Sequence, residues 1–260
     1  MDALLELDGI TKSFGGLVAV KNLSFSIGEG EILGLIGPNG AGKTTVFNLI
    51  SGVYRPEAGS IRFNGKVISG LKPHEVSSLG IARTFQTVRP FARMSARENV
   101  MAGLLFGRSG IIAPRRATQK ALEILELVSL LDKAEVRAGH LTLAEQKRLE
   151  LARALATSPK LLMLDEVVAG LNHSEMNAMV DLLRRIQPER GMALIVIEHV
   201  MKAIVRLCNR IVVMNGGEKL VEGSPSEVMR DERVVAAYMG RRGNDDDDGE
   251  STTTSSSAPQ

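Results

Sequence analysis

The chain has 260 residues, of which 44% are hydrophobic, and this is enough for a full core in one or two domains. Cys208 is the only cysteine, which excludes a small fold held by intrachain disulfides and favours a reducing compartment, with Cys208 as a small buried apolar residue. The formal net charge is +2, and aromatic residues make up only 3% of the chain. Few side chains are therefore available to stack on nucleic-acid bases, and we expect no nucleic-acid partner.

The N-terminal part predicts antiparallel strands. Residues 4–8 and 20–27 alternate between apolar and polar side chains. Residues 61–63 lead into Asn64-Gly65, a strong signal for a tight hairpin turn. The first six residues carry acids where a secretory signal carries Lys or Arg, so we expect no signal peptide.

Short apolar runs further along the chain predict buried strands. These runs are Glu31–Ile36, Leu161–Leu164, Ala193–Ile197 and Ile211–Met214. They alternate with helical stretches, which predicts an α/β fold with a mainly parallel sheet and helices on both of its faces. These runs are much shorter than the roughly 18 residues that a membrane-spanning helix needs. We therefore expect membrane association only through a partner.

Residues 91–157 differ from the rest, because Ala121, Leu125 and Val128 have helical spacing and no convincing strand is found. We predict an inserted helical subdomain over 91–157, between two parts of a core domain at 1–90 and 158–240. Residues 241–260 hold five acidic side chains, two arginines and runs of Ser and Thr, which predicts a disordered acidic tail. Without that tail the chain carries about +5.

A glycine-rich loop follows the first buried strand. Residues 37–45 read Gly-Pro-Asn-Gly-Ala-Gly-Lys-Thr-Thr, which fits G-x-x-x-x-G-K-[ST] ahead of a predicted helix and indicates a P-loop NTPase. In such a loop the backbone N–H groups point at phosphate oxygens. Lys43 is predicted to reach the β- and γ-phosphates of ATP, and Thr44 to offer a hydroxyl to Mg²⁺. The predicted nucleotide-binding residues of the loop are Gly37, Pro38, Asn39, Gly40, Ala41, Gly42, Lys43, Thr44 and Thr45.

Two acids end the apolar run that begins at Leu161. Ligands of open α/β sheets bind at the carboxyl ends of the strands, where Asp165 and Glu166 are placed. We predict that Asp165 binds Mg²⁺ and that Glu166 is the general base that polarises the attacking water. The alternative for either residue is an ordinary strand-end acid that caps a helix.

Together these motifs resemble the ATP-binding subunits of ABC transporters over essentially residues 4–240. The resemblance implies that Gln86, in the stretch 82–86, is the Q-loop glutamine that touches Mg²⁺ or water. It also implies that His199 is the switch histidine that contacts the γ-phosphate, and that residues 169–172 form the D-loop at a dimer interface. Phe14 stacks on adenine in this interpretation, with core packing as its alternative.

The signature segment departs from the family's L-S-G-G-Q, because Leu143 and Ala144 replace both glycines. Thr142 and Glu145 predict a capping box at the start of a helix that ends before Ser158-Pro159. The N–H groups of Leu143 and Ala144 can still face an anion, although their Cβ atoms are expected to hold a phosphate further away. The predicted signature contacts to nucleotide are therefore Thr142, Leu143, Ala144 and Glu145.

The resemblance implies that two such chains pack head to tail, as a homodimer or heterodimer, with each nucleotide between one chain's phosphate loop and the other chain's signature helix. It further implies integral-membrane permease subunits and, indirectly, a solute-binding protein. The chain is then peripheral, at the cytoplasmic face of the cell (inner) membrane. We expect the surface from Gln86 to Phe106 to dock a cytoplasmic helix of the permease. Its apolar residues are Val88, Phe91, Met94 and Val100, which form plain core in the alternative interpretation.

Within the family, Ile197-Glu198-His199 and Ala237-Tyr238-Met239-Gly240 are among the stretches similar to subunits for branched-chain amino-acid import. Uptake systems for urea, amides and aromatic acids share this sequence style, and Val167 stands where proline is expected. The predicted function is ATP hydrolysis that energises solute import, with branched-chain amino acids as the predicted solute. The alternatives are an exporter ATPase for lipid or lipopolysaccharide, a catalytically silent ATP-gated subunit, and a soluble ABC ATPase.

Overall fold

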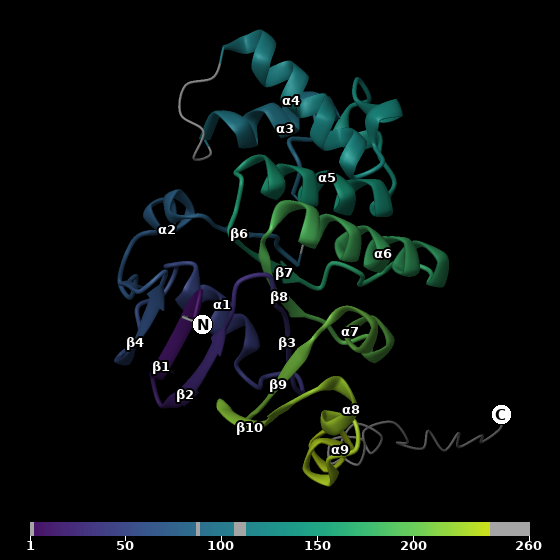
Figure 1. The fold of residues 1–260 in the computed structure, drawn as a ribbon. Helices are drawn as coiled ribbons and strands as arrows, with labels where there is room; N and C mark the ends of the chain where they lie inside the picture. The colour runs from purple at the N-terminus through teal and green to yellow at the C-terminus, as the bar shows by residue number, and fades with distance from the viewer. Residues whose placement is uncertain (1–2, 87–88, 107–112, 240–260) are drawn as a thin grey trace, which may run out of the picture.

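The structure is a computed structural model that describes residues 3–86, 89–106 and 113–239 (Figure 1). Its strands are β1 (Leu5–Phe14), β2 (Leu17–Ile27), β3 (Ile32–Ile36), β4 (Ala58–Phe63), β5 (Lys66–Val67), β6 (Ile81–Arg83), β7 (Leu161–Asp165), β8 (Ala193–Ile197), β9 (Arg210–Asn215) and β10 (Glu218–Gly223). Its α-helices are α1 (Lys43–Ile50), α2 (Pro73–Leu79), α3 (Ala96–Phe106), α4 (Pro114–Leu127), α5 (Leu143–Ala156), α6 (His173–Arg190), α7 (Met201–Leu207), α8 (Pro225–Val228) and α9 (Glu232–Met239). Short 3₁₀ turns lie at Leu131–Lys133 and Ala138–His140.

The predicted antiparallel strands are confirmed as a four-stranded sheet with the order β2-β1-β4-β5. The hairpin turn between β4 and β5 contains Asn64 and Gly65, which both have positive φ, at 48° and 72°. Two consecutive left-handed residues are what a two-residue hairpin turn requires, so the Asn-Gly signal was correctly interpreted.

The second sheet has six strands in the order β10-β9-β3-β8-β7-β6. The pairs from β9 to β6 are all parallel, and β10 runs antiparallel to β9 at the edge, so the predicted mainly parallel sheet is confirmed. β3 begins one residue later than its apolar run. Glu31 lies just before the strand, with its N–H bonded to the Gly28 carbonyl in a turn and its carboxylate accepting from the Gly28 N–H and from Arg210.

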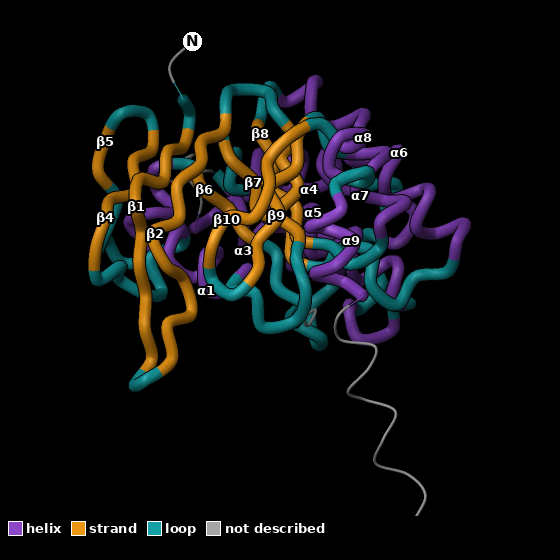
Figure 2. The backbone as a smooth tube through the Cα atoms, turned by 90° about the horizontal axis from the view of Figure 1, so that it is seen from below, coloured by secondary structure: helices purple, strands orange, loops and turns teal. Residues whose placement is uncertain are grey.

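Alternate residues of the parallel strands face two different cores. Leu33 and Leu35 of β3 pack on one side with α1 and the four-stranded sheet, whereas Ile32 and Ile36 pack on the other side with α6, α7 and the 91–157 helices. Figure 2 shows the four-stranded sheet and α6–α7 on opposite sides of the six-stranded sheet. Helices therefore do lie on both faces, but on the first face α1 shares the covering with a second sheet, which the sequence pattern did not indicate.

Helices α3, α4 and α5 lie together at one end of the molecule (Figure 1). The approach of α3 to α5 is close at Gly103, where an added Cβ would lie 2.7 Å from the carbonyl oxygen of Arg153. These helices fall within the segment 91–157 that was predicted to be an insertion. The division at 1–90, 91–157 and 158–240 remains a prediction, and the expected tail at 241–260 lies outside the described residues.

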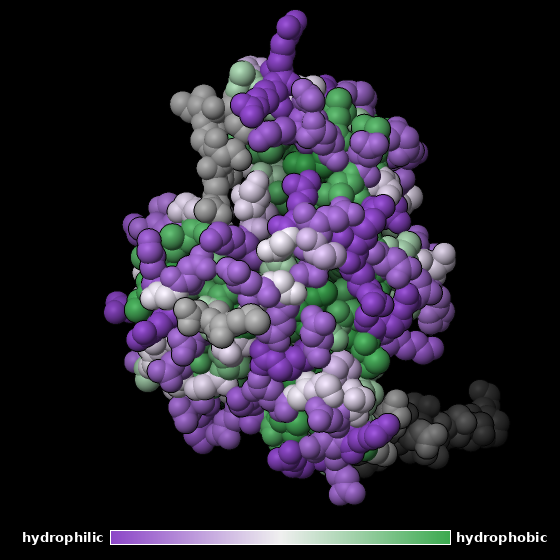
Figure 3. Space-filling model, viewed as in Figure 1, coloured by the Kyte–Doolittle hydropathy of each residue, from purple (hydrophilic) through white to green (hydrophobic). Residues whose placement is uncertain are grey.

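Hydrophilic side chains cover most of the face drawn in Figure 3, and hydrophobic residues gather there only in separate patches. Among the described helices, none is long and apolar enough to cross a membrane. Cys208, the one cysteine, is buried as predicted, with its Sγ packed near Gly34 of β3. Burial raises the pKa of its thiol to about 12.

Candidate functional site

The phosphate loop connects β3 to α1 and depends on glycine at two close approaches. A Cβ on Gly37 would lie 2.1 Å from the carbonyl oxygen of Met214, and one on Gly42 would lie 2.3 Å from that of Ala19. Gly42 also has a φ of 99°, which side chains strongly disfavour. The loop is thus built into the six-stranded sheet and the β1–β2 hairpin, and α1 begins directly after it with its N–H groups at the loop.

Lys43 is the first residue of α1 and is buried. Its ammonium donates hydrogen bonds to the carbonyl oxygens of Gly37, at 2.7 Å, and Pro38, at 3.0 Å. The cation therefore lies against the loop itself, together with backbone N–H groups at a helix N-terminus. This combination of one ammonium and a glycine-rich helix start is suited to binding an anionic phosphate chain.

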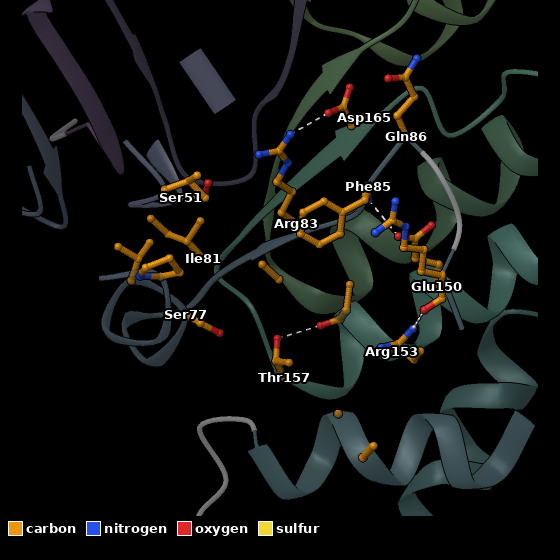
Figure 4. A pocket seen from close by; sticks show the side chains of 18 of the residues that line it. Ser51, Ser77, Ile81, Arg83, Phe85, Gln86, Glu150, Arg153, Thr157 and Asp165 are labelled. Atoms are coloured by element: carbon orange, nitrogen blue, oxygen red, sulfur yellow. Dashed lines mark hydrogen bonds and ion pairs between the residues drawn. The ribbon is translucent and has the colours of Figure 1, made fainter. Parts of the chain in front are cut away.

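Asp165 ends β7 and is paired with a residue that the sequence analysis missed. Arg83, at the end of the neighbouring β6, donates to Asp165 Oδ2 at 2.8 Å and to Asn48 Oδ1 on α1 at 2.6 Å. Figure 4 shows the guanidinium directed at Asp165. Burial raises the pKa of Asp165, and the hydrogen bond and charge of Arg83 act in the opposite direction. The only sequence signal for Arg83 was its place three residues before Gln86.

Glu166 receives contacts from two other predicted site residues. Gln86 Nε2 donates to Glu166 Oε2 at 2.9 Å, and His199 Nε2 lies 2.9 Å from Glu166 Oε1. These three residues follow three neighbouring strands, β6, β8 and β7, whose carboxyl ends meet at one edge of the sheet. The structure therefore brings the predicted glutamine, glutamate and histidine together, although they are up to 113 positions apart in the chain.

The residues predicted to hold Mg²⁺ are suited to binding the metal ion as a complex with a nucleotide. Thr44, Gln86 and Asp165 line the same cleft and offer a hydroxyl, an amide and a carboxylate oxygen. Mg²⁺ is bound by one or two carboxylates and completes its octahedral shell with water and substrate phosphates. Within residues 3–86, 89–106 and 113–239 there is no group of three or more His, Cys, Asp or Glu side chains that could hold a metal alone. The donor set thus fits Mg²⁺ only together with phosphate oxygens.

The signature segment forms the predicted capping box at the start of α5. The Thr142 hydroxyl accepts from the Glu145 N–H at 3.3 Å, and the Glu145 carboxylate accepts from the Thr142 N–H at 2.8 Å. Leu143 is half exposed, and its side chain lies beside Gly170, where an added Cβ would be 3.1 Å from Leu143 Cδ2. One residue that replaces a signature glycine therefore packs on the 169–172 segment of its own chain.

Phe14 ends β1 with 42% of its surface exposed. Its ring meets that of Tyr54 edge to face, with centroids 5.0 Å apart, and Lys12 Nζ lies 5.4 Å from its centroid. The alternative that Phe14 is a core residue is therefore wrong. Stacking of this ring on adenine remains a prediction.

The cleft that Thr44, Gln86 and Asp165 line has a volume of about 810 Å³ and extends from them to the space between α2, β6, α3 and α5 (Figure 4). Of the apolar residues expected to dock a permease, Phe91 lines this cleft and is exposed, and Met94 is exposed nearby in the chain. Val100 is fully buried, so its assignment to a docking surface was wrong and it belongs to the core because it faces inward from α3. Val88 lies outside the described residues.

Comparisons with known proteins match this chain to one family. The family model described as ABC transporter matches residues 20–169, and one described as branched-chain amino acid ATP-binding cassette transporter matches residues 218–243. The high-affinity branched-chain amino acid transport ATP-binding protein BraF of Pseudomonas aeruginosa is 40% identical over 249 residues, covering 91% of this chain and 98% of that protein.

Two solved structures have the same fold. MJ1267, an ATP-binding cassette of an ABC transporter, has a TM-score of 0.85 and 30% identity, covering 92% of this chain and 100% of that one. The dimeric cassette MJ0796, in a post-hydrolysis state bound to ADP and Pi, has a TM-score of 0.77 and 27% identity, covering 85% of this chain and 98% of that one. With its phosphate loop, its strand-end acids and these matches over most of its length, the chain belongs to the ATP-binding cassette family of ABC transporters.

Proposed function

We propose that the chain binds and hydrolyses ATP and thereby drives solute import, with branched-chain amino acids as the solute class. The observation that carries the proposal is the placement of Glu166, whose carboxylate lies between Gln86 and His199 at the strand edge that also holds Asp165. A carboxylate oriented by two polar partners beside a phosphate-binding loop is suited to aligning a water for attack on a γ-phosphate.

Each residue then has a defined task. The loop N–H groups and Lys43 bind the phosphates. Thr44, Gln86 and Asp165 would hold Mg²⁺, which would supply positive charge next to the phosphate oxygens when bound. Glu166 orients the water and accepts its proton, while His199 and Lys43 stabilise the charge that develops on the γ-phosphate.

The partners follow from the family. The dimeric form of MJ0796 supports a dimer of cassettes in which Thr142, Leu143, Ala144 and Glu145 face the nucleotide bound by the other chain. The permease subunits hold this subunit at the cytoplasmic face of the membrane, and the cleft that Phe91 lines is where we place their docking helix. The helical segment 91–157 would transmit the closure of the dimer to them.

The solute class is supported by the printed function of BraF and by the match of residues 218–243 to a branched-chain amino acid family model. It is tested by deleting the gene in its host and measuring the uptake of labelled leucine and of labelled urea. Loss of leucine uptake with intact urea uptake supports the proposal. Loss of urea uptake with intact leucine uptake contradicts the solute class and leaves the ATPase assignment in place.

ATP hydrolysis is tested with Glu166→Gln, which keeps the shape of the side chain and removes the base. We expect turnover to fall by at least about 100-fold, while the affinity for a fluorescent ATP analogue remains close to that of the wild type. The matched control is Glu135→Gln, because Glu135 is an exposed acid that pairs with Arg97. Equal turnover by the wild type and Glu166→Gln would contradict the proposal.

A further inference from the structure

Lys147 is a lysine with only 5% of its surface exposed, in the second turn of α5. Its ammonium donates a hydrogen bond to the backbone carbonyl oxygen of Glu166 at 2.7 Å. Burial lowers the pKa of Lys147, and the negative charges of Glu198, Glu150 and Glu166 oppose this effect. Burying an ammonium costs free energy unless the group makes specific contacts. The burial of Lys147 at this position therefore requires an explanation, and its bond to Glu166 is the contact to consider.

Glu166 has an unusual backbone conformation, with a φ of 53°. Elsewhere in the described parts of the chain, the non-glycine residues with positive φ are Asn22, Asn64, Ser129 and Ser158. Asn tolerates this region because its short polar side chain can bond locally, whereas a glutamate there is strained. Such strain persists only where surrounding contacts impose it, and it is concentrated at functional sites.

The contacts that impose this conformation come from both sides of the residue. The Glu166 N–H donates to the carbonyl oxygen of Ile197 on β8 at 2.9 Å. The Glu166 carbonyl oxygen accepts from the Lys147 ammonium on α5 at 2.7 Å and, in the turn that follows, from the Ala169 N–H at 3.2 Å. The carboxyl group of the neighbouring Glu198 accepts a hydrogen bond from the Val168 N–H at 2.7 Å. The hydrogen bond of the Lys147 ammonium goes to the Glu166 carbonyl instead. The Glu166 peptide is therefore held between the sheet and the signature helix.

We propose that Lys147 is a positioning residue for Glu166. By holding the carbonyl, it fixes the left-handed conformation that directs the carboxylate to Gln86 and His199. It also ties that geometry to α5, whose first turn is the signature segment, so a shift of α5 is carried to the carboxylate through one hydrogen bond. This inference rests on the proposed role of Glu166 as general base.

The first test compares Lys147→Met with Arg148→Met in the full chain. The first variant keeps the bulk of the side chain and removes its donor, and the control changes the next residue of the same helix, which lines a shallow pocket with Asp181 and Arg185. We expect Lys147→Met to lower kcat by about 100-fold, since small misplacements of a catalytic group have effects of this size. The affinity for the fluorescent ATP analogue should change less than about 3-fold. A loss of affinity with unchanged kcat, or an equal effect of Arg148→Met, overturns the inference.

The second test separates positioning from a merely structural role. In the Glu166→Gln background, Lys147→Met should cause no further loss of turnover, because its effect passes through the carboxylate that is already absent. The same further loss in both backgrounds overturns the inference. Lys147→Gln should retain more activity than Lys147→Met, because its amide still offers a donor. If Lys147→Met does not fold, Lys147→Gln replaces it in both comparisons, with a smaller loss of kcat expected in the wild-type background.

The outcomes also distinguish this inference from the proposed function. If Glu166→Gln itself leaves turnover unchanged, the assignment of the general base fails. If Glu166→Gln is inactive while Lys147→Met is fully active, only the role of Lys147 fails.

Discussion

At the scale of single residues, Glu198 is a buried acid whose ionisation is tied to folding. Only 2% of its surface is exposed, and burial raises its pKa from 4.5 to about 7. The hydrogen bond from the Val168 N–H and the charge of Lys147 act against this rise, and the charge of Glu166 adds to it. Between pH 4.5 and about pH 7, the folded chain therefore holds a proton that the unfolded chain has already released.

This difference predicts the direction of a pH effect. Because the folded state binds more protons, the contribution of Glu198 to stability is fully present below pH 4.5 and is lost as the pH rises through about 7. We expect the wild type to lose about 2 kcal/mol of unfolding free energy from this group between pH 5.5 and pH 8. Urea unfolding at the two pH values measures it, and Glu198→Gln should flatten the dependence.

The control for this prediction is Glu135→Gln, since Glu135 lies on the surface. Its pH dependence should match that of the wild type. If Glu198→Gln retains the full dependence as well, the buried carboxyl of Glu198 is not its source.

The residues of the candidate site fall into two groups, those that a local sequence motif identifies and those that only the tertiary structure brings to the site. Lys43, Asp165 and Glu166 stand in local motifs, and a motif needs no knowledge of the fold. Arg83 and Lys147 act on these residues across the chain, Arg83 because β6 lies beside β7 and Lys147 because α5 packs near the end of β7. Nothing in the local sequence specifies those neighbours, so both residues were missed.

At the scale of elements, the approach of α3 to α5 leaves no room for a side chain at Gly103. In an exposed helix, replacing glycine by alanine is stabilising by up to about 1 kcal/mol. Here the added Cβ would meet the Arg153 carbonyl oxygen at 2.7 Å, so the two helices must move apart. We expect Gly103→Ala to lower the thermal midpoint of unfolding despite its better helix propensity.

Gly16→Ala is the control for this experiment. Gly16 lies in the β1–β2 turn, where an added Cβ would have no atom of the other described residues within 4 Å apart from its two chain neighbours. Its midpoint should remain close to that of the wild type. A rise in the midpoint for Gly103→Ala would show that propensity outweighs the clash.

Helices and strands were predictable from the sequence where the pattern of their own residues determines their type and limits. The limits of β8 agree fully with the apolar run Ala193–Ile197, and the α5 capping box was found from Thr142 and Glu145. β6 has only three residues, and it exists as a strand because it pairs with β7. Such a short run has no periodicity to detect, which explains why it was not predicted.

At the scale of the whole molecule, Arg210 joins the two sheets. It begins β9 and donates to the carbonyl oxygen of Ser26 on β2 at 2.6 Å and to Glu31, just before β3, at 2.7 Å. It also pairs with Glu222 on β10. One guanidinium thus connects the antiparallel sheet to one side of the parallel sheet.

Removal of this connection should destabilise the protein as a whole. We expect Arg210→Met to lower the unfolding free energy by about 2 kcal/mol, because charged hydrogen bonds are lost and Glu31 loses its cation. The control is Arg233→Met, since an ion pair on the surface such as that of Arg233 with Asp231 contributes little to stability. Urea unfolding measures both, and equal losses would contradict a special role for Arg210.

The arrangement of the whole molecule was the least predictable part. The strand order β10-β9-β3-β8-β7-β6 brings segments from both ends of the chain together, and the four-stranded sheet covers part of one face. Periodicity shows which residues are buried, but it does not show against which segment they pack.

The burial of Cys208 has a practical consequence for chemical labelling. Thiol reagents attack the thiolate, and with a pKa of about 12 this buried side chain remains protonated at neutral pH. A cysteine introduced at an exposed position such as Phe91, in the wall of the cleft, is then the one reactive thiol of the molecule. Spin labels and fluorophores can therefore be attached to the native sequence background, and movements between the helical segment and the sheets can be followed without first replacing a residue of the core.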